Sequence, residues 1–306
     1  RAAAFTTWLA AATPLTWLSA GRTGSDALGL ALLTASASAV GSAYALSSGR
    51  RHWLWAGAFL AGLTLGARLS YAPMVAVLVI YAVWMGRERA LAAFVAGLAV
   101  WVLPFIAIAG PALLEHGQTF LVGHFTAWGG TAFLADGTGG SWASRSIQWL
   151  GHLGIHGLAF PVAGGGPLRW LAAAGLLGAL ATGVWQLKRH QLRVLAVLAI
   201  PYVIWLIVGQ NPEKPRHLLP LLPIVAIIAG SGLARWRVLP AAAICAALAG
   251  VTATVAPRHH SDPSAAVQLA QWLQLHEQPN RVRVFTGQSE RVIGTLAPEY
   301  RVEYAR

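Results

Sequence analysis

The sequence predicts an all-α polytopic membrane bundle of about nine membrane helices, two of them short, with a small C-terminal α/β extramembrane segment. Three observations lead to this fold class. Of the 306 residues, 56% are apolar and only 10% are charged, whereas about a quarter are charged in soluble domains. The mean hydropathy is +0.58, and several charge-free runs are long enough to cross a bilayer. The basic residues behind the net charge of +12 lie in short clusters between these runs. This pattern indicates membrane topology and argues against nucleic acid as a partner.

Nine apolar runs are predicted as membrane helices, at roughly 2–20, 27–47, 53–66, 71–85, 90–110, 167–187, 194–210, 218–234 and 238–256. The runs 53–66 and 71–85 fall short of the ~20 residues that a span needs. One long tilted helix over 53–85 is the alternative, but the alternation of basic clusters between the two sides favours two short helices. The side with more basic residues is expected to be cytoplasmic. The other side receives Arg22, Arg68, Lys214 and Arg216.

The predicted transmembrane domain covers 1–256 and includes one long outer loop, 111–166, whose aromatic-rich amphipathic helices are expected to lie along the membrane surface. Residues 257–306 form a predicted extracytoplasmic α/β tail, with a helix beginning near Ser261 and strands at 281–285 and 300–304. We expect this tail to be incomplete, because two strands are marginal alone. The chain begins at Arg1 inside an apolar run, so we expect it to lack its N-terminus. The lone Cys245 excludes a disulfide framework.

The first candidate site is the segment 211–217, where Lys214, Arg216 and His217 precede an apolar helix predicted to begin at Leu218. Ionisable groups are costly at a membrane span and usually mark a substrate or ion site. Cationic side chains beside the free N–H groups of a helix start would bind an anion. We therefore expect a phosphate-binding site here.

Two more candidates lie on the same predicted side. Arg68 stands between the two short helices, with the hydroxyl donors Ser70 and Tyr71 beside it, and this set suits bidentate phosphate binding. An arginine lying at the interface is the alternative. Asp26 begins a predicted helix, either as an N-cap carboxylate, as a ligand of a divalent metal ion or as a partner of Arg22 or Arg68.

In the outer loop, His124 and Trp128 are four residues apart and could share one helix face with His116. A two-histidine metal site and sugar stacking on Trp128 are both open, and solvated histidines are the simplest alternative. The sequence contains no nucleophile elbow, Walker loop or dinucleotide fingerprint in the required context.

Three passages together resemble the GT-C superfamily of membrane glycosyltransferases, such as the polyprenyl-phosphate-mannose protein mannosyltransferases and the lipid A aminoarabinose transferases. Residues 14–30 resemble their "P…R…SD…GL" passage. Residues 62–73 resemble their "GLxxGxRxSYxP" segment, and residues 214–223 resemble their "PRHLLPLLP" helix entrance. Each motif is loose, so the weight of the resemblance lies in their order.

The resemblance implies an enzyme of the inner (plasma) membrane that transfers a sugar from a polyprenyl-phosphate donor to a protein, lipid or glycan acceptor outside the cytoplasm. It implies that the site and the tail face the extracytoplasmic side. Asp26 would match the second acidic position, which is associated with catalysis, a metal ion or acceptor placement. Arg68, Lys214 and Arg216 would bind the donor phosphate, with Arg22, Tyr71, His124, Trp128 and His217 as further substrate-binding candidates. The principal catalytic acid of the family would lie upstream of Arg1.

Two other classes of membrane protein remain open. A secondary transporter predicts inverted repeats and ionisable groups near the bilayer midplane, whereas no repeat is evident here and the polar residues gather on one side. An O-antigen polymerase or ligase would share the outer loop and the arginines, but would act on a diphosphate-linked glycan. Such an enzyme would not need Asp26.

Overall fold

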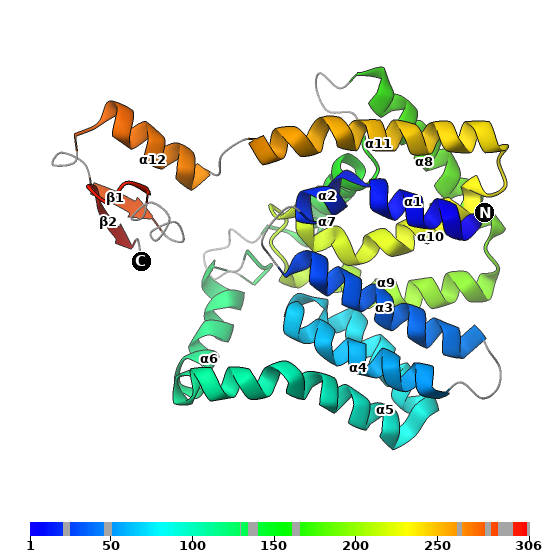
Figure 1. Cartoon of the computed structure of the whole chain (residues 1–306), viewed down its shortest axis with the longest axis horizontal. Coiled ribbons are helices and arrows are strands. Elements are labelled where there is room, and N and C mark those ends of the chain that lie inside the picture. The colour runs from blue at the N-terminus through cyan, green and yellow to red at the C-terminus, as the bar shows by residue number, and fades with distance from the viewer. Residues whose placement is uncertain are drawn as a thin grey trace. The chain divides into compact units, whose positions relative to one another are not determined.

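A computed structural model of the chain describes residues 1–20, 25–45, 51–128, 130–133, 140–160, 166–261, 265–278, 283–286 and 296–304. These residues are overwhelmingly helical (Figure 1). The chain divides into two compact units, Arg1–Ala253 and Thr254–Arg306, and each has buried apolar residues of its own.

The first half of the larger unit consists of α1 (Ala2–Ala12), α2 (Pro14–Ala20), α3 (Asp26–Ala45), α4 (Arg51–Ala67), the 3₁₀ turn η1 (Leu69–Tyr71) and α5 (Ala72–Ala109). The predicted helix 2–20 is broken at Thr13, which has an extended backbone because the following Pro14 disfavours the helical conformation. Two helices flank Arg68, as predicted, and a single helix over 53–85 is excluded.

Helix α5 changes direction at Arg87, whose φ of 51° and ψ of −142° are not helical. The packing shows the reversal. Gly86 lies beside Leu54 near the start of α4, whereas Gly97 lies beside Phe59 and Trp101 beside Gly66 further along α4. The part of α5 after Arg87 therefore runs alongside α4 in the same direction as α4.

The second half contains α6 (Pro111–Gly123), the π-helical turn η2 (His124–Trp128), α7 (Trp142–His152), the π-helical turn η3 (Leu153–Gly157), α8 (Pro167–Gln186), α9 (Arg189–Gly209), the 3₁₀ helix η4 (Pro215–Leu221), α10 (Leu222–Leu233) and α11 (Val238–Ser261). The predicted outer loop is thus largely helical. In α7, Arg145 and Trp149 are buried while Trp142, Ile147 and Leu150 are exposed, so this helix is amphipathic.

The predicted number of membrane helices is wrong. Among the described residues, six apolar ranges are long enough to cross a membrane, by length and composition: Asp26–Tyr44, Leu69–Ala109, Pro167–Gln186, Arg189–Gly209, Pro215–Leu233 and Val238–Val255. Helix α4 has only 17 residues, and the first predicted span is broken at Thr13. The range Leu69–Ala109 reverses at Arg87, which lies between the predicted spans 71–85 and 90–110 as expected. The six ranges support a multi-pass membrane protein with the lipid bilayer as a partner.

Small residues allow the helices of the larger unit to pack closely. A Cβ atom on Gly183 of α8 would collide with the backbone carbonyl of Ile228 on α10, and one on Gly232 of α10 would collide with the carbonyl of Ala179 on α8. Where apolar surface faces lipid, helices associate through such close backbone contacts. The α8–α10 crossing therefore depends on glycine at these positions.

The predicted C-terminal α/β segment is not supported as part of the fold class. In the smaller unit, α12 (Ala265–His276) holds residues 296–300 through Tyr300, whose hydroxyl donates to the carbonyls of Leu273 at 2.6 Å and Glu277 at 2.7 Å. Two strands lie close to the predicted positions, β1 (Arg283–Thr286) and β2 (Arg301–Tyr304), and pair in parallel. Each has only four residues, and within the described residues they pair only with each other. Such a pair is too small to form a sheet layer, so the chain is all-α in class.

Candidate functional site

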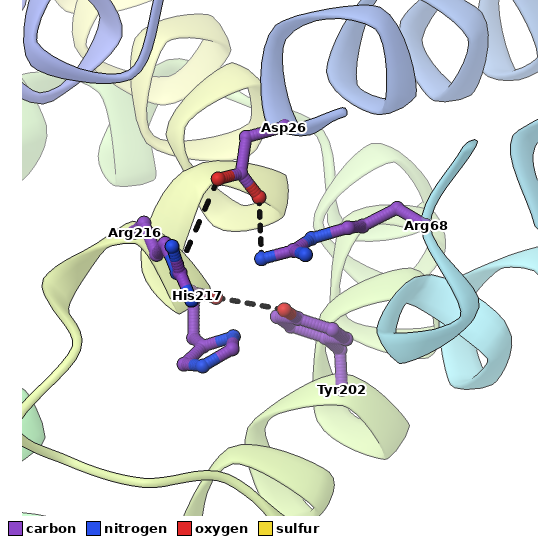
Figure 2. Close-up of polar contacts among 5 residues, drawn as sticks. All are labelled: Asp26, Arg68, Tyr202, Arg216 and His217. Atoms are coloured by element: carbon purple, nitrogen blue, oxygen red, sulfur yellow. Dashed lines mark hydrogen bonds and ion pairs between the residues drawn. The ribbon is translucent and has the colours of Figure 1, made fainter. Parts of the chain in front are cut away.

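The structure brings together one acid and two arginines that are far apart in the sequence (Figure 2). The Nη2 atom of Arg68 lies 2.6 Å from Oδ1 of Asp26, and the Nε atom of Arg216 lies 4.0 Å from its Oδ2. The Asp26 side chain is 4% exposed, compared with 22% for Arg68 and 34% for Arg216. We call these three residues the Asp26 cluster. The contact with Arg68 is an ion pair, since Oδ1 of Asp26 has no partner with hydrogen-bond geometry among the described residues.

Each member of the cluster stands at a helix end. Asp26 is the first residue of α3. Arg68 caps η1 with an extended backbone, and its N–H donates to the Thr64 carbonyl at the end of α4. The close approach of α3 to Arg68 requires Gly29, because a Cβ atom there would lie 2.8 Å from Cβ of Arg68 and 3.2 Å from the Tyr71 ring.

The third member, Arg216, lies in η4, which is a 3₁₀ helix because prolines interrupt the α-helical hydrogen bonds. Pro220 and Pro223 have no N–H to donate, and α10 begins only at Leu222. The anion site predicted at the start of a helix at Leu218 is therefore not formed as expected. The N–H of His217 already donates to the Lys214 carbonyl at 3.1 Å, so the side chains, and not free backbone N–H groups, carry the positive charge.

Two fully buried tyrosines support the cluster. The hydroxyl of Tyr202, in α9, donates to the His217 carbonyl at 2.7 Å, which ties α9 to η4 (Figure 2). Its ring meets the edge of the Tyr71 ring, with centroids 6.2 Å apart. Both residues are 0% exposed. These contacts between α9, η1 and η4 hold the backbone next to Arg216 in place.

Hydrogen-bond donors remain unused in the segments that form the cluster. Buried polar atoms without a hydrogen-bond partner among the described residues include Nε of Arg68, Nε of Arg216, the hydroxyls of Ser70 and Tyr71, and Nδ1 of His217. Buried polar atoms in proteins are almost always paired with protein, water or ligand. Five such atoms in the two segments that carry the arginines are therefore available to water or to a polar ligand.

Helix α7 and residues 130–133 are fastened to the C-terminal end of α9. The guanidinium of Arg145, which is 2% exposed, donates to the carbonyls of Ile207 and Gln210, and the Trp149 indole N–H donates to the Leu206 carbonyl at 2.9 Å. Nearer the chain's start, the Ala132 N–H donates to the Val208 carbonyl at 2.9 Å. The region 111–166 is therefore docked on the bundle in its described part.

Aromatic and imidazole rings extend from the cluster into α7 and η3. The Trp149 ring lies 6.4 Å from the His217 ring and 6.2 Å from the His152 ring, and His152 stacks on His156 at 5.5 Å between centroids. Burial lowers the pKa of both His152 and His156, so these imidazoles favour the neutral form. Neutral rings beside a cationic site do not add repulsion between like charges.

The sequence-predicted site residues separate into three groups. Asp26, Arg68, Tyr71, Arg216 and His217 are brought together. His124 and Lys214 lie near the cluster. The pKa of His124 is lowered mainly by burial and also by the positive charge of Lys214. Two predictions lie beyond what the structure describes: Arg22 is outside the described residues, as is the side chain of Trp128.

The residues around Asp26 do not fit a divalent metal ion. Both carboxylate oxygens of Asp26 face guanidinium groups (Figure 2), and a metal ion would be repelled by these two positive charges. The described residues contain no group of three or more His, Cys, Asp or Glu side chains that could hold a metal ion. Glu213 is exposed and its backbone N–H donates to the Asn211 side chain at 2.9 Å.

Sequence reasoning missed Gly29, Tyr202 and the anchoring roles of Arg145 and Trp149. A hydroxyl in the middle of the apolar run 194–210 was the available signal for Tyr202, because polar groups in a span usually have a partner. The contacts of Gly29 and Arg145 depend on which helices are neighbours, and no local pattern reports that.

Replacement of Arg145 by methionine is expected to release α7 from α9. The carbonyls of Ile207 and Gln210 would lose a charged donor, which costs about 2–3 kcal/mol. The amides of α7 should then exchange hydrogen faster in detergent micelles. Ser146→Ala is the matched control, since the Ser146 hydroxyl bonds only within α7 to the Trp142 carbonyl. Equal exchange protection of α7 in both variants would contradict the anchoring role.

Together, the fold and the cluster define a multi-pass helical membrane protein with a buried acid held between two arginines at the ends of its helices. No protein family, curated protein or solved structure matches the chain.

Proposed function

We propose that the Asp26 cluster binds the phosphate of a polyprenyl-phosphate-linked sugar, and that the protein transfers this sugar to an acceptor outside the cytoplasm. One observation carries the proposal. The three passages that resemble GT-C glycosyltransferases, separated by up to about two hundred residues, contribute Asp26, Arg68 and Arg216 to a single cluster. The spacing of these passages along the chain does not by itself require the three residues to lie together.

The charge of the cluster suits a phosphodiester. Two guanidinium groups and one carboxylate leave one uncompensated positive charge in a largely buried setting, and such a charge is costly unless an anion joins it. A sugar linked through phosphate to a polyprenyl chain carries a single negative charge on that phosphate. Arginine forks are well shaped for phosphate oxygens. The exposed Lys214 adds further attraction for an approaching anion.

The same arginines would assist bond cleavage. In transfer, the acceptor oxygen bonds to the anomeric carbon while the bond between that carbon and the phosphate oxygen breaks. The phosphate then leaves with a second negative charge, and cations already in place stabilise the charge as it develops. The acceptor proton passes to a base, for which Asp26 is poorly suited because its carboxylate is paired with Arg68. We therefore assign Asp26 the role of holding the two arginines in position.

This role for Asp26 keeps one alternative open, an enzyme that acts on a diphosphate-linked glycan. Two arginines and an exposed lysine could also hold a diphosphate. The two functions differ in ligand preference, since a diphosphate carries more negative charge than the net charge of the cluster balances. Comparing the monophosphate and diphosphate donors in the same binding assay separates them.

The test measures binding of polyprenyl phosphate to the purified chain in lipid nanodiscs. Arg216→Gln removes a charged donor, so binding should weaken about ten- to a hundred-fold. Arg235→Gln is the matched control, because Arg235 is exposed at the end of α10 and outside the cluster; its affinity should equal that of the wild type. Polyprenyl alcohol, which has no phosphate, should bind weakly to all three proteins. The proposal fails if the two variants bind alike or if the alcohol binds as well as the phosphate.

A further inference from the structure

A second site lies at the other end of α3. A cavity of about 280 Å³ opens between α3, α5 and α9, within three of the ranges long enough to span a membrane. Its lining is almost entirely apolar. Asp26 and Tyr44 stand near opposite ends of α3, so the rise of a helix puts them about 27 Å apart. The cavity is therefore separate from the Asp26 cluster.

The cavity has a closed floor and an open rim. Its floor is formed by Val40 of α3 and Leu78 of α5, which are 6% and 4% exposed, whereas Tyr44 and Val197 on the rim are each 57% exposed. Gly41 leaves room at the wall, since a Cβ atom there would meet nothing within 4 Å. A pocket that is closed inward and open outward along a membrane helix can receive a hydrocarbon chain from the side.

The polar residues that line the cavity are two tyrosines and an arginine, and none of the described acidic residues lines it. Tyr44 and Tyr81 meet edge to face, with ring centroids 6.3 Å apart, and both line the cavity with Arg193 of α9. Arg193 forms no ion pair with a carboxylate in the described part of the chain. Arg189, four residues earlier, lies on the same face of α9. The lining residues that carry polar groups are thus two tyrosines and one arginine at the edge of an otherwise apolar surface.

We propose that this cavity binds an anionic phospholipid of the bilayer, with one acyl chain against Val40, Gly41 and Leu78 and the phosphate at Arg193, Tyr44 and Tyr81. The apolar lining within membrane helices selects a lipid over a soluble ligand. A cation beside tyrosine hydroxyls selects an anionic head group, because such groups at a membrane surface attract anionic lipids. The cavity volume admits part of one chain, so the rest of the lipid stays in the bilayer.

The experiment uses the full chain in nanodiscs of phosphatidylglycerol and phosphatidylethanolamine in equal amounts with identical acyl chains. Native mass spectrometry then counts each lipid retained after the disc is removed. The wild type should retain phosphatidylglycerol in preference to phosphatidylethanolamine. Gly41→Phe fills the cavity with a ring and should lower retention about ten-fold, and Arg193→Gln should abolish the preference between the two head groups.

Two matched controls separate the site from general effects. Gly151→Phe makes the same change at an exposed helical glycine that also has open space around it, and Arg235→Gln removes an exposed arginine elsewhere. Both should retain lipid like the wild type. The proposal is wrong if Gly41→Phe and Gly151→Phe retain equal lipid, or if Arg193→Gln keeps the full head-group preference. The result is independent of polyprenyl-phosphate binding, since none of these positions belongs to the Asp26 cluster.

Discussion

Replacing Arg68 by methionine is expected to destabilise the chain by about 3 kcal/mol, because it leaves the buried carboxylate of Asp26 without its closest partner. Arg216 compensates only in part, since its Nε atom is 4.0 Å away. The measurement is thermal unfolding in detergent micelles. Arg235→Met is the matched control, because that exposed side chain lies outside the cluster, and its midpoint should stay at the wild-type value.

A double variant distinguishes the loss of an ion pair from a loss of packing. In the Asp26→Asn, Arg68→Met protein no carboxylate remains to be neutralised, so much of the stability lost in Arg68→Met should return. The coupling between the two positions, taken from the complete cycle of single and double variants, should be about 1–3 kcal/mol. Additive effects of the two substitutions would show that the pair contributes little, and the cluster would then not be a coupled unit.

Replacing Gly183 by alanine is expected to have an effect at least as large, about 3 kcal/mol or more. The added methyl group would occupy the position of the Ile228 backbone carbonyl, and a backbone atom cannot move aside as a flexible side chain can. Helices α8 and α10 would have to separate, which also removes the contact of Gly232 with Ala179. The measurement is again the midpoint of thermal unfolding, together with the yield of folded monomer from size-exclusion chromatography.

Gly178→Ala is the matched control on the same helix. A Cβ atom at Gly178 would approach only the ring of Trp236, at 3.3 Å, and this side chain can adjust by a few tenths of an ångström. Its midpoint should remain within a few degrees of the wild type, because alanine also favours the helix. Equal destabilisation by Gly178→Ala and Gly183→Ala would mean that the α8–α10 crossing does not depend on the Gly183 contact.

Sequence patterns predicted the helical membrane character and the break around Arg68, because both depend on local composition. They failed to predict the break in the apolar run 2–20. Thr13 interrupts an apolar run through the proline that follows it. The reversal at Arg87, by contrast, falls between the predicted spans 71–85 and 90–110, where the charged residues 87–89 interrupt the apolar run. Hydropathy measures how well residues tolerate lipid, so a break inside an apolar run, such as the one at Thr13, does not show in it.

The sequence predicted the members of the candidate site, and it gave the pairing of Asp26 with Arg68 as one of several alternatives. Arg68, Arg216 and Asp26 each stood out because ionisable groups are rare in apolar runs. Their pairing depends on Gly29, which lets α3 approach Arg68, and on the 3₁₀ path of η4. The sequence left three roles open for Asp26, as an N-cap, as a metal ligand or as a partner of Arg22 or Arg68. The structure shows the pairing with Arg68, and Arg216 lies nearby.

The anchoring of Arg145 has an electrostatic consequence for the neighbouring end of the bundle. Helix α9 ends at Gly209, and the aligned peptide dipoles of a helix place about half a negative charge at such an end. An anion approaching His217, which hydrogen-bonds to α9 through Tyr202, would be repelled by that partial charge. The guanidinium of Arg145 donates to the terminal carbonyls of Ile207 and Gln210, and its positive charge opposes that partial charge. The same residue that fastens α7 to α9 therefore also offsets the macrodipole of α9.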